Sequence, residues 1–181
     1  MTKLVGRYLL ASLALLAGVA YADSADTQSL IQEKLNSLRW LSNDSQVVAA
    51  VQDYNAHPSA SAQGMTNDKW ENLTVLDPFV RSLTKTPVMT YLKEKKDPAI
   101  SELFISGADG GKVGFLGKTT SWTHKGKPKH EKPMEGKDWI GTVEVDSSSG
   151  VEQVQVALPV LEGGKPIGSV VVGLAVNRLR Q

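Results

Sequence analysis

The fold is decided by residues 139–175, which read WIGTVEVDSSSGVEQVQVALPVLEGGKPIGSVVVGLA. Polar and apolar residues alternate over residues 140–146, so that Val143 and Val145 share one face. This period of two is the pattern of a half-buried β-strand. The serine-rich run 147–150 then supplies turn residues. The stretch therefore opens a meander of antiparallel strands joined by short turns.

A second and a third strand follow in the same stretch. Residues 154–160 alternate again, and the Gly-Gly pair 163–164 tolerates the positive φ that primed hairpin turns require. The third strand, residues 167–176, is apolar on both faces, with Ile167 and Val171 together on one of them. Because a strand with two apolar faces is covered on both sides, we expect it at the centre of a sheet.

An earlier hairpin completes this sheet. The pattern predicts strands over residues 103–106 and 113–116, on either side of a glycine-rich turn at 107–111. Sequential strands usually lie side by side, so the hairpin is expected against the central last strand. The prediction is an α+β fold with a five-stranded antiparallel sheet in the order 2-1-5-4-3 and helices packed on one face. The sheet part spans residues 101–177.

The chain before the sheet, residues 27–96, has helical spacing. Ser29 and Gln32 fit a capping box, and apolar residues at helical spacing then run to Leu41, which predicts a long amphipathic helix. A second helix is expected to end before Pro58, and short helices follow over residues 67–73, 79–83 and 87–95. The apolar residues expected to form a packing layer there are Trp70, Phe79, Val80, Leu83, Val88, Met89 and Leu92.

The N-terminus resembles an export signal. Lys3 and Arg7 precede an apolar run over residues 8–19, and an Ala-Tyr-Ala sequence at 20–22 provides a cleavage site. The alternative is a membrane anchor, but the run is well short of the roughly 20 residues that cross hydrocarbon. We expect residues 1–22 to be a cleaved signal peptide and residues 23–181 to form one periplasmic domain without a membrane span.

Composition excludes several classes of function. Residues 1–22 contain two of the 20 basic residues and none of the 19 acidic ones, so 18 basic residues face 19 acidic ones in the mature chain. A charge so near neutrality gives no electrostatic footprint for nucleic acid. The chain has no cysteine, which excludes disulfides, thiol nucleophiles and thiolate metal ligands.

Short motifs lie in order along most of the mature chain. They are Glu102-Leu103-Phe104-Ile105-Ser106 with Gly110, Lys118-Thr119-Thr120, Asp146-Ser147-Ser148, Leu158-Pro159-Val160 and Ile167-Gly168. In this order the chain resembles the extracytoplasmic Cache (PAS-like) sensor domains of bacterial chemoreceptors and sensor kinases. The resemblance implies a small-molecule ligand, either an amino acid, an amine or a carboxylate, held between the sheet and the loop before the strand at residues 140–146. It also implies a membrane receptor or a kinase as the protein partner.

That loop, residues 117–138, is the predicted site. It is long for a connection without secondary structure, and long loops over a rigid sheet often carry binding function. Two tryptophans bracket it as facing walls of a cavity, and polar residues of the loop and of the strand at residues 140–146 are anchors. The candidate ligand-binding residues are Lys118, Thr120, Trp122, Trp139, Thr142 and Asp146.

The charge of the ligand follows from two departures from the resembled family. An acidic residue tends to follow the Lys-Thr-Ser/Thr stretch there and holds cationic groups, but Ser121 stands at that place here. Gly107 stands where an Asp is common. These departures disfavour an amine, and six lysines in the loop favour an anion. A solvated basic loop is the alternative reading.

Catalysis, metals and cofactors are not expected. No nucleophile motif of the G-x-S-x-G or S-x-x-K type is present. His124, His130 and Glu131 have the chemistry of metal ligands, but their spacing lacks the helical i,i+4 pair that fixes two imidazoles on one ion. Two alternatives to a sensor domain stay open, which are a ligand-free accessory protein docking on a membrane sensor or other envelope protein, and a hydrolytic or metal-dependent enzyme.

Overall fold

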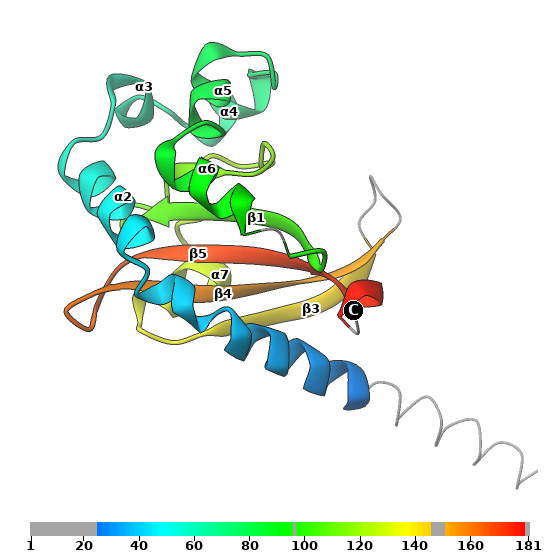
Figure 1. The fold of residues 1–181 in the computed structure, drawn as a ribbon. Coiled ribbons are helices and arrows are strands. Elements are labelled where there is room, and N and C mark those ends of the chain that lie inside the picture. The colour runs from blue at the N-terminus through cyan, green and yellow to red at the C-terminus, as the bar shows by residue number, and fades with distance from the viewer. Residues whose placement is uncertain (1–24, 96, 146–150, 180–181) are drawn as a thin grey trace, which may run out of the picture.

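A computed structural model describes residues 25–95, 97–145 and 151–179. Its centre is one antiparallel sheet with the strand order β2-β1-β5-β4-β3, as predicted (Figure 1). The strands are β1 (Ile100–Gly107), β2 (Lys112–Phe115), β3 (Trp139–Val145), β4 (Glu152–Glu162) and β5 (Lys165–Ala175). The central position of β5 is confirmed, since it pairs with β1 on one side and with β4 on the other.

The tight turn between β4 and β5 follows from its glycines. Gly163 and Gly164 have φ values of 55° and 83°, which side chains of L-residues disfavour. This turn sets the register in which Leu158 lies opposite Val170. A register fixed in this way keeps the apolar faces of both strands aligned.

The helices begin earlier and are more numerous than predicted. The chain is helical over residues 25–37, so the start predicted at Ser29 is wrong; residues 25–28 contain neither glycine nor proline to interrupt a helix. Asp44 caps α2 by accepting hydrogen bonds from the backbone N–H groups of Gln46 and Val47. The further elements are η1 (Arg39–Ser42), α2 (Ser45–Ala56), α3 (Ala60–Gln63), α4 (Asn67–Asn72), α5 (Pro78–Leu83), α6 (Pro87–Glu94), α7 (Pro128–Met134) and η2 (Val176–Arg178).

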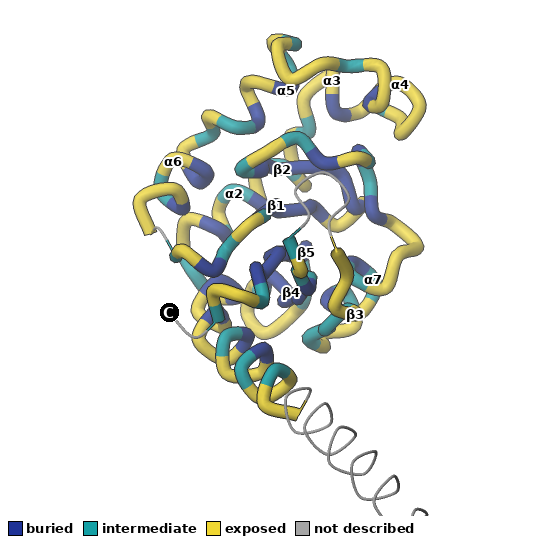
Figure 2. Tube along the Cα trace, turned by 90° about the vertical axis from the view of Figure 1, so that its right-hand side faces the viewer, coloured by how far each residue is buried: buried dark blue, intermediate teal, exposed yellow. Residues whose placement is uncertain are grey.

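One face of the sheet packs against the N-terminal helix, α2 and α6. In Figure 2 these helices turn their buried side to the strands and their exposed side to solvent. The core on this face is aliphatic, with residues such as Ile31, Leu35, Val51, Met89 and Val172 all at most 2% exposed. Ile167 contacts this cluster as well, so its predicted place beside Val171 is wrong.

The opposite face carries a second, aromatic core. Trp70, Phe104, Phe115 and Trp122 are buried there together with Val171 of the central strand. Helix α7 also covers this face, as its contacts with β4 and β5 show. The prediction that helices cover one face only is therefore wrong. Two prolines hid α7 from sequence patterns, although the first of them occupies the opening turn of the helix, where proline is tolerated.

The second half of the edge strand β3 is exposed on both faces. Val143 and Val145 share the apolar face, and they are 37% and 63% exposed. The strand has a neighbour on one side only, and its second half lies outside both core clusters. Among the described residues, no helix is long and apolar enough to cross a membrane. The predicted signal peptide, residues 1–22, lies outside the described residues.

Candidate functional site

A cavity of about 890 Å³ lies on the aromatic face of the sheet. Strands β1, β3 and β4 supply one side of it, and the segment between β2 and β3, with α7, supplies the other. Phe104 and Trp139 are its aromatic residues. The polar side chains that line it around these rings include Glu102, Lys118, Thr120, His124, Lys129 and Gln155. A concave surface with an apolar base and a few converging polar groups is typical of a small-molecule site.

Four of the six predicted site residues line this cavity. They are Lys118, Thr120, Trp139 and Thr142. Thr120 and Thr142 are exposed at the rim, whereas Lys118 and Trp139 are partly buried. The Lys118 ammonium lies 4.9 Å from the centre of a Trp70 ring, where a cation–π contact orients it.

The other two predicted residues are placed differently. Trp122 is 3% exposed and packs in the aromatic core, 5.3 Å from Trp70 and 5.6 Å from Phe79 between ring centres. It does not belong to the described lining of the cavity, so the facing pair of tryptophans is not formed. Asp146 lies outside the described residues.

Sequence reasoning missed a chain of polar contacts along the inner end of the cavity. The Lys129 ammonium donates to Gln155 Oε1 at 2.9 Å, and Gln155 Nε2 donates to Glu102 Oε2 at 2.7 Å. His130 is buried in α7 and its Nδ1 lies 2.8 Å from Ser169 Oγ. Lys129 and His130 were predicted to lie in an irregular loop, and only α7 turns them toward the sheet.

Lys112 is fully buried behind this end of the cavity. Its ammonium donates to His124 Nδ1 at 2.6 Å, lies 3.5 Å from Ser106 Oγ, and sits 4.4 Å from the centre of the Phe104 ring. Among the described residues it forms no salt bridge. Burial, reinforced by the charge of Lys129, lowers the pKa of Lys112 to about 7. The signal for Lys112 in the sequence is weak, because a lysine at the first position of a strand usually faces water.

His124 connects Lys112 to the cavity. Burial first, and the charge of Lys112 second, lower the pKa of His124 to about 2, so its imidazole is neutral at neutral pH. When Lys112 is charged its ammonium can only donate, so Nδ1 then accepts and the ring proton is assigned to Nε2. The ring stacks on Phe104 at 4.9 Å between ring centres and lines the cavity.

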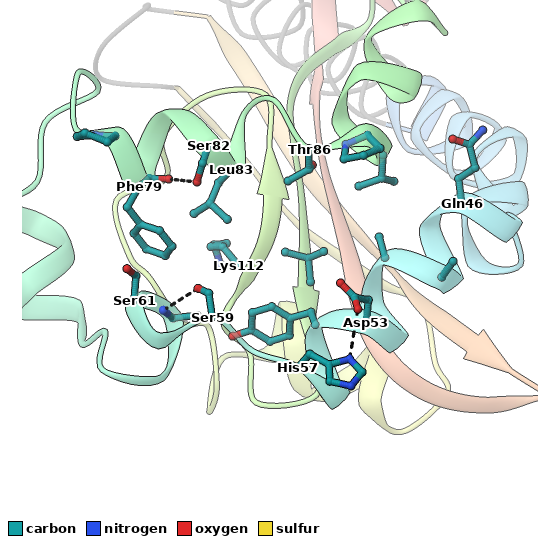
Figure 3. A pocket seen from close by; sticks show the side chains of 18 of the residues that line it. Gln46, Asp53, His57, Ser59, Ser61, Phe79, Ser82, Leu83, Thr86 and Lys112 are labelled. Carbon is teal, nitrogen blue, oxygen red and sulfur yellow. Dashed lines mark hydrogen bonds and ion pairs between the residues drawn. The ribbon is translucent and has the colours of Figure 1, made fainter.

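A second, larger cavity of about 990 Å³ lies on the helical side (Figure 3). It is a groove between α2 and the pair α5–α6, with Lys112 and Val113 of β2 at its base. The groove is mainly apolar, and two of its titratable residues, Asp53 and His57, are about 80% exposed and lie at the rim. The first cavity is the better candidate site, because buried polar groups converge on it.

The fold is similar to that of a histidine kinase sensor domain, that of DctB from V. cholerae. The TM-score is 0.52 at 16% sequence identity, and the alignment covers 94% of this chain and 60% of that chain. A weaker likeness is to the ligand-binding domain of the Pseudomonas aeruginosa PAO1 amino-acid chemoreceptor PctC in complex with GABA, with a TM-score of 0.39 at 14% identity over 81% of this chain and 62% of that chain. Another is to the ligand-binding domain of the Pseudomonas fluorescens chemoreceptor CtaA in complex with L-alanine, with a TM-score of 0.42 at 15% identity over 91% of this chain and 61% of that chain.

No protein-family model matches the chain, and no curated protein matches it. The chain spans about 60% of the length of the sensor domains to which it is similar. The chain thus has the Cache fold of the DctB sensor domain, as its sequence motifs predict.

Proposed function

We propose that the protein is a sensor domain that binds a small molecule in the 890 Å³ cavity and acts in the periplasm after removal of residues 1–22. The observation that carries the proposal is the convergence on one concave surface of the polar groups of Lys118, His124, Lys129 and Gln155. Buried polar groups cost free energy unless they are paired, so a surface that gathers them is suited to a polar ligand.

The ligand is an amino acid, an amine or a carboxylate. Trp139 offers an apolar face and one N–H donor, and Thr142 lies within the irregular segment of β3 between Ile140 and Val143. A membrane receptor or kinase is the protein partner to which the occupied domain reports. Ligand occupancy would be transmitted through the sheet, since β1, β3 and β4 all contribute lining residues.

A thermal-shift screen of amino acids, amines and carboxylates tests the proposal. A ligand at 100 times its dissociation constant adds about 2.7 kcal/mol, which raises the Tm of a domain of this size by about 5–10 °C. Trp139→Ala should abolish the shift, because Trp139 lines the cavity. Trp40→Ala is the matched control, since that indole is 40% exposed and lies outside the lining.

The accessory-protein alternative has one observation in its favour. The second half of edge strand β3 exposes Val143 and Val145, and an exposed apolar edge is a surface on which another protein can pair. If no compound of a broad screen stabilises the domain, this alternative replaces the sensor function. A partner captured in a β3-dependent manner would then be required to establish it.

A further inference from the structure

We infer that the protein forms a two-fold dimer, in which the turn at residues 74–76 of each copy docks into the groove between α2 and the pair α5–α6 of the other copy. The turn is called the apolar knob below, and the 990 Å³ groove is called the helical groove. The inference goes beyond the proposed function and is independent of it, because neither surface contributes to the cavity on the aromatic face.

The apolar knob presents two large side chains to solvent. Val75 is 63% exposed, and Leu76, at 74%, is the most exposed large apolar residue that the structure describes. Turns are usually built from Gly, Pro, Asn, Asp and Ser, whose conformations and side chains suit an exposed bend. Two adjacent apolar residues at the tip of a turn are therefore a surface suited to burial by a partner.

Local hydrogen bonds hold the knob in place. The backbone N–H of Asp77 donates to the carbonyl of Thr74 at 3.1 Å, which closes the turn around Val75 and Leu76. The backbone N–H of Leu76 also donates to Thr74 Oγ1 at 3.3 Å. On either side of the knob, Leu73 packs against the aromatic core and Asp77 caps α5. A knob that is ordered before it binds loses little conformational freedom on association.

The helical groove offers an apolar space of matching size. Ala49 and Ala50 of α2 belong to one wall, and Phe79 and Leu83 of α5 belong to the other, where Figure 3 labels both. Val113 of β2 lies at the base and is 7% exposed. A volume of about 990 Å³ is near the upper end of the cavities that hold a drug-sized molecule, so a short turn fits within it.

The knob and the groove lie side by side on one surface. Asp77 and Pro78, which follow the knob directly in the chain, already line the groove. A surface that carries both a knob and a groove can bind a second copy of itself about a two-fold axis, with each knob in the groove of the other copy. This closed arrangement covers both apolar surfaces at once, and it favours a second copy over an unrelated partner.

The extent of the surface also fits a dimer. The groove is lined by 19 of the described residues, and the three residues of the knob bring the number to 22 on each side. Stable interfaces between proteins contain about 20–30 residues a side.

The charges at this surface do not oppose the contact. The carboxylate of Asp77 accepts hydrogen bonds from the first turn of α5, and Asp53 Oδ1 lies 3.3 Å from His57 Nδ1 at the rim. The Lys112 side chain nitrogen is engaged by His124 Nδ1 at 2.6 Å. An interface centre without unpaired charges is typical of protein–protein contacts.

Sedimentation equilibrium of the purified protein between about 10 µM and 1 mM tests the inference. The wild type should form a dimer with a dissociation constant below about 100 µM. Val75→Glu and Leu76→Glu should each weaken the dimer at least tenfold, because each would bring a carboxylate into an apolar groove. Ala49→Glu, an exposed position on the groove wall, should have the same effect.

Val145→Glu is the matched control. Val145 is 63% exposed, as Val75 is, but it belongs to the edge strand β3 and lies outside the groove lining. The control should leave the dimer unchanged. All four variants replace exposed residues, so circular dichroism should show the wild-type fold in each of them.

Disulfide cross-linking assigns the two surfaces to each other, since the chain has no cysteine of its own. Leu76→Cys, labelled with nitrogen-15, is mixed with unlabelled Ala49→Cys or Ser82→Cys, which place a thiol on the α2 wall or the α5 wall. Mild oxidation should give a covalent dimer that contains one labelled and one unlabelled chain, as mass spectrometry would show. The same mixture with Val145→Cys should not give it.

Three results would overturn the inference. The first is a protein that stays monomeric at about 1 mM, which leaves the groove to a small apolar molecule. The second is a dimer that persists in Val75→Glu and Leu76→Glu, or that only Val145→Glu dissociates, since its interface then lies elsewhere. The third is a dimer in which Leu76→Cys cross-links to neither groove cysteine. The thermal-shift screen of the ligand cavity is a separate experiment, so each of these failures is distinguishable from a failure of the proposed function.

Discussion

Replacing Lys112 by Met should stabilise the protein. Lys112 is fully buried, and its pKa of about 7 lies well below the ordinary value of 10.5. The unfolded chain therefore binds a proton more strongly than the folded one. The free energy of unfolding contributed by this group is at its highest above pH 10.5 and is lost as the pH falls toward 7. Methionine has a similar length and no charge to bury.

The magnitude follows from the same values. A difference of one pKa unit corresponds to about 1.4 kcal/mol, so the drop from 10.5 to about 7 in Lys112 corresponds to about 5 kcal/mol at neutral pH. The variant also loses the hydrogen bond to His124 Nδ1, which is worth about 1 kcal/mol. The expected net gain at pH 7 is about 4 kcal/mol, a large part of the total stability of an ordinary domain.

Urea denaturation at pH 7 and at pH 10.5 measures this gain directly. Around pH 10.5 the amine is half neutral in the unfolded chain as well, so the advantage of Lys112→Met should fall below about 1 kcal/mol. The control is Lys125→Met, an exposed substitution expected to change stability by less than about 0.5 kcal/mol at either pH. A variant that is no more stable than wild type at pH 7, or whose advantage is the same at both pH values, would refute the reasoning.

Three further predictions concern the core, acid sensitivity and export. Trp122→Ala should destabilise the domain by about 3–5 kcal/mol, because the indole is 3% exposed in the aromatic core. Urea denaturation measures the loss against the exposed control Trp40→Ala, and equal stability of the two variants would contradict the prediction. The pKa of His124 is about 2 in the folded protein against 6.5 ordinarily, so the free energy of unfolding should decline by about 1.4 kcal/mol per pH unit below pH 6.5. The variant His124→Phe should show a flatter decline in melts between pH 4 and 7. The mature protein should begin at Asp23, as N-terminal sequencing of a periplasmic extract would show; material that begins at Met1 and sediments with membranes would argue for an anchor.

Local patterns in the sequence are sufficient for the sheet. The period of two, the Gly-Gly pair at 163–164 and the two apolar faces of β5 are properties of short segments, and together they predict the strand order that the structure has. The cap at Asp44 and the end of α2 before Pro58 are local in the same way. Such features are predictable because the residues that determine them are neighbours in the chain.

Burial and the inner end of the site depend on tertiary contacts. Val143 has the right alternation for a buried face, but whether that face is covered depends on which elements pack beside an edge strand. Trp122 lies in the loop that the sequence selects, yet Trp70 and Phe79, far away in the chain, draw its indole into the core. Thr142 and Trp139 could be named in advance because they follow the loop directly and belong to a predicted strand.

The pair Lys112 and His124 shows most clearly what the sequence alone does not determine. A lysine at the start of a strand and a histidine in a loop each read as surface residues, and no periodicity connects them. Their contact exists because β2 places the lysine on the aromatic face and the segment leading to α7 returns over it. The depressed pKa values follow from the exclusion of water by that packing. The sequence by itself therefore determines which segments form strands and how these strands pair. The charge state and direction of the groups in the cavity are properties of the assembled tertiary structure, because desolvation depends on all the atoms around a group.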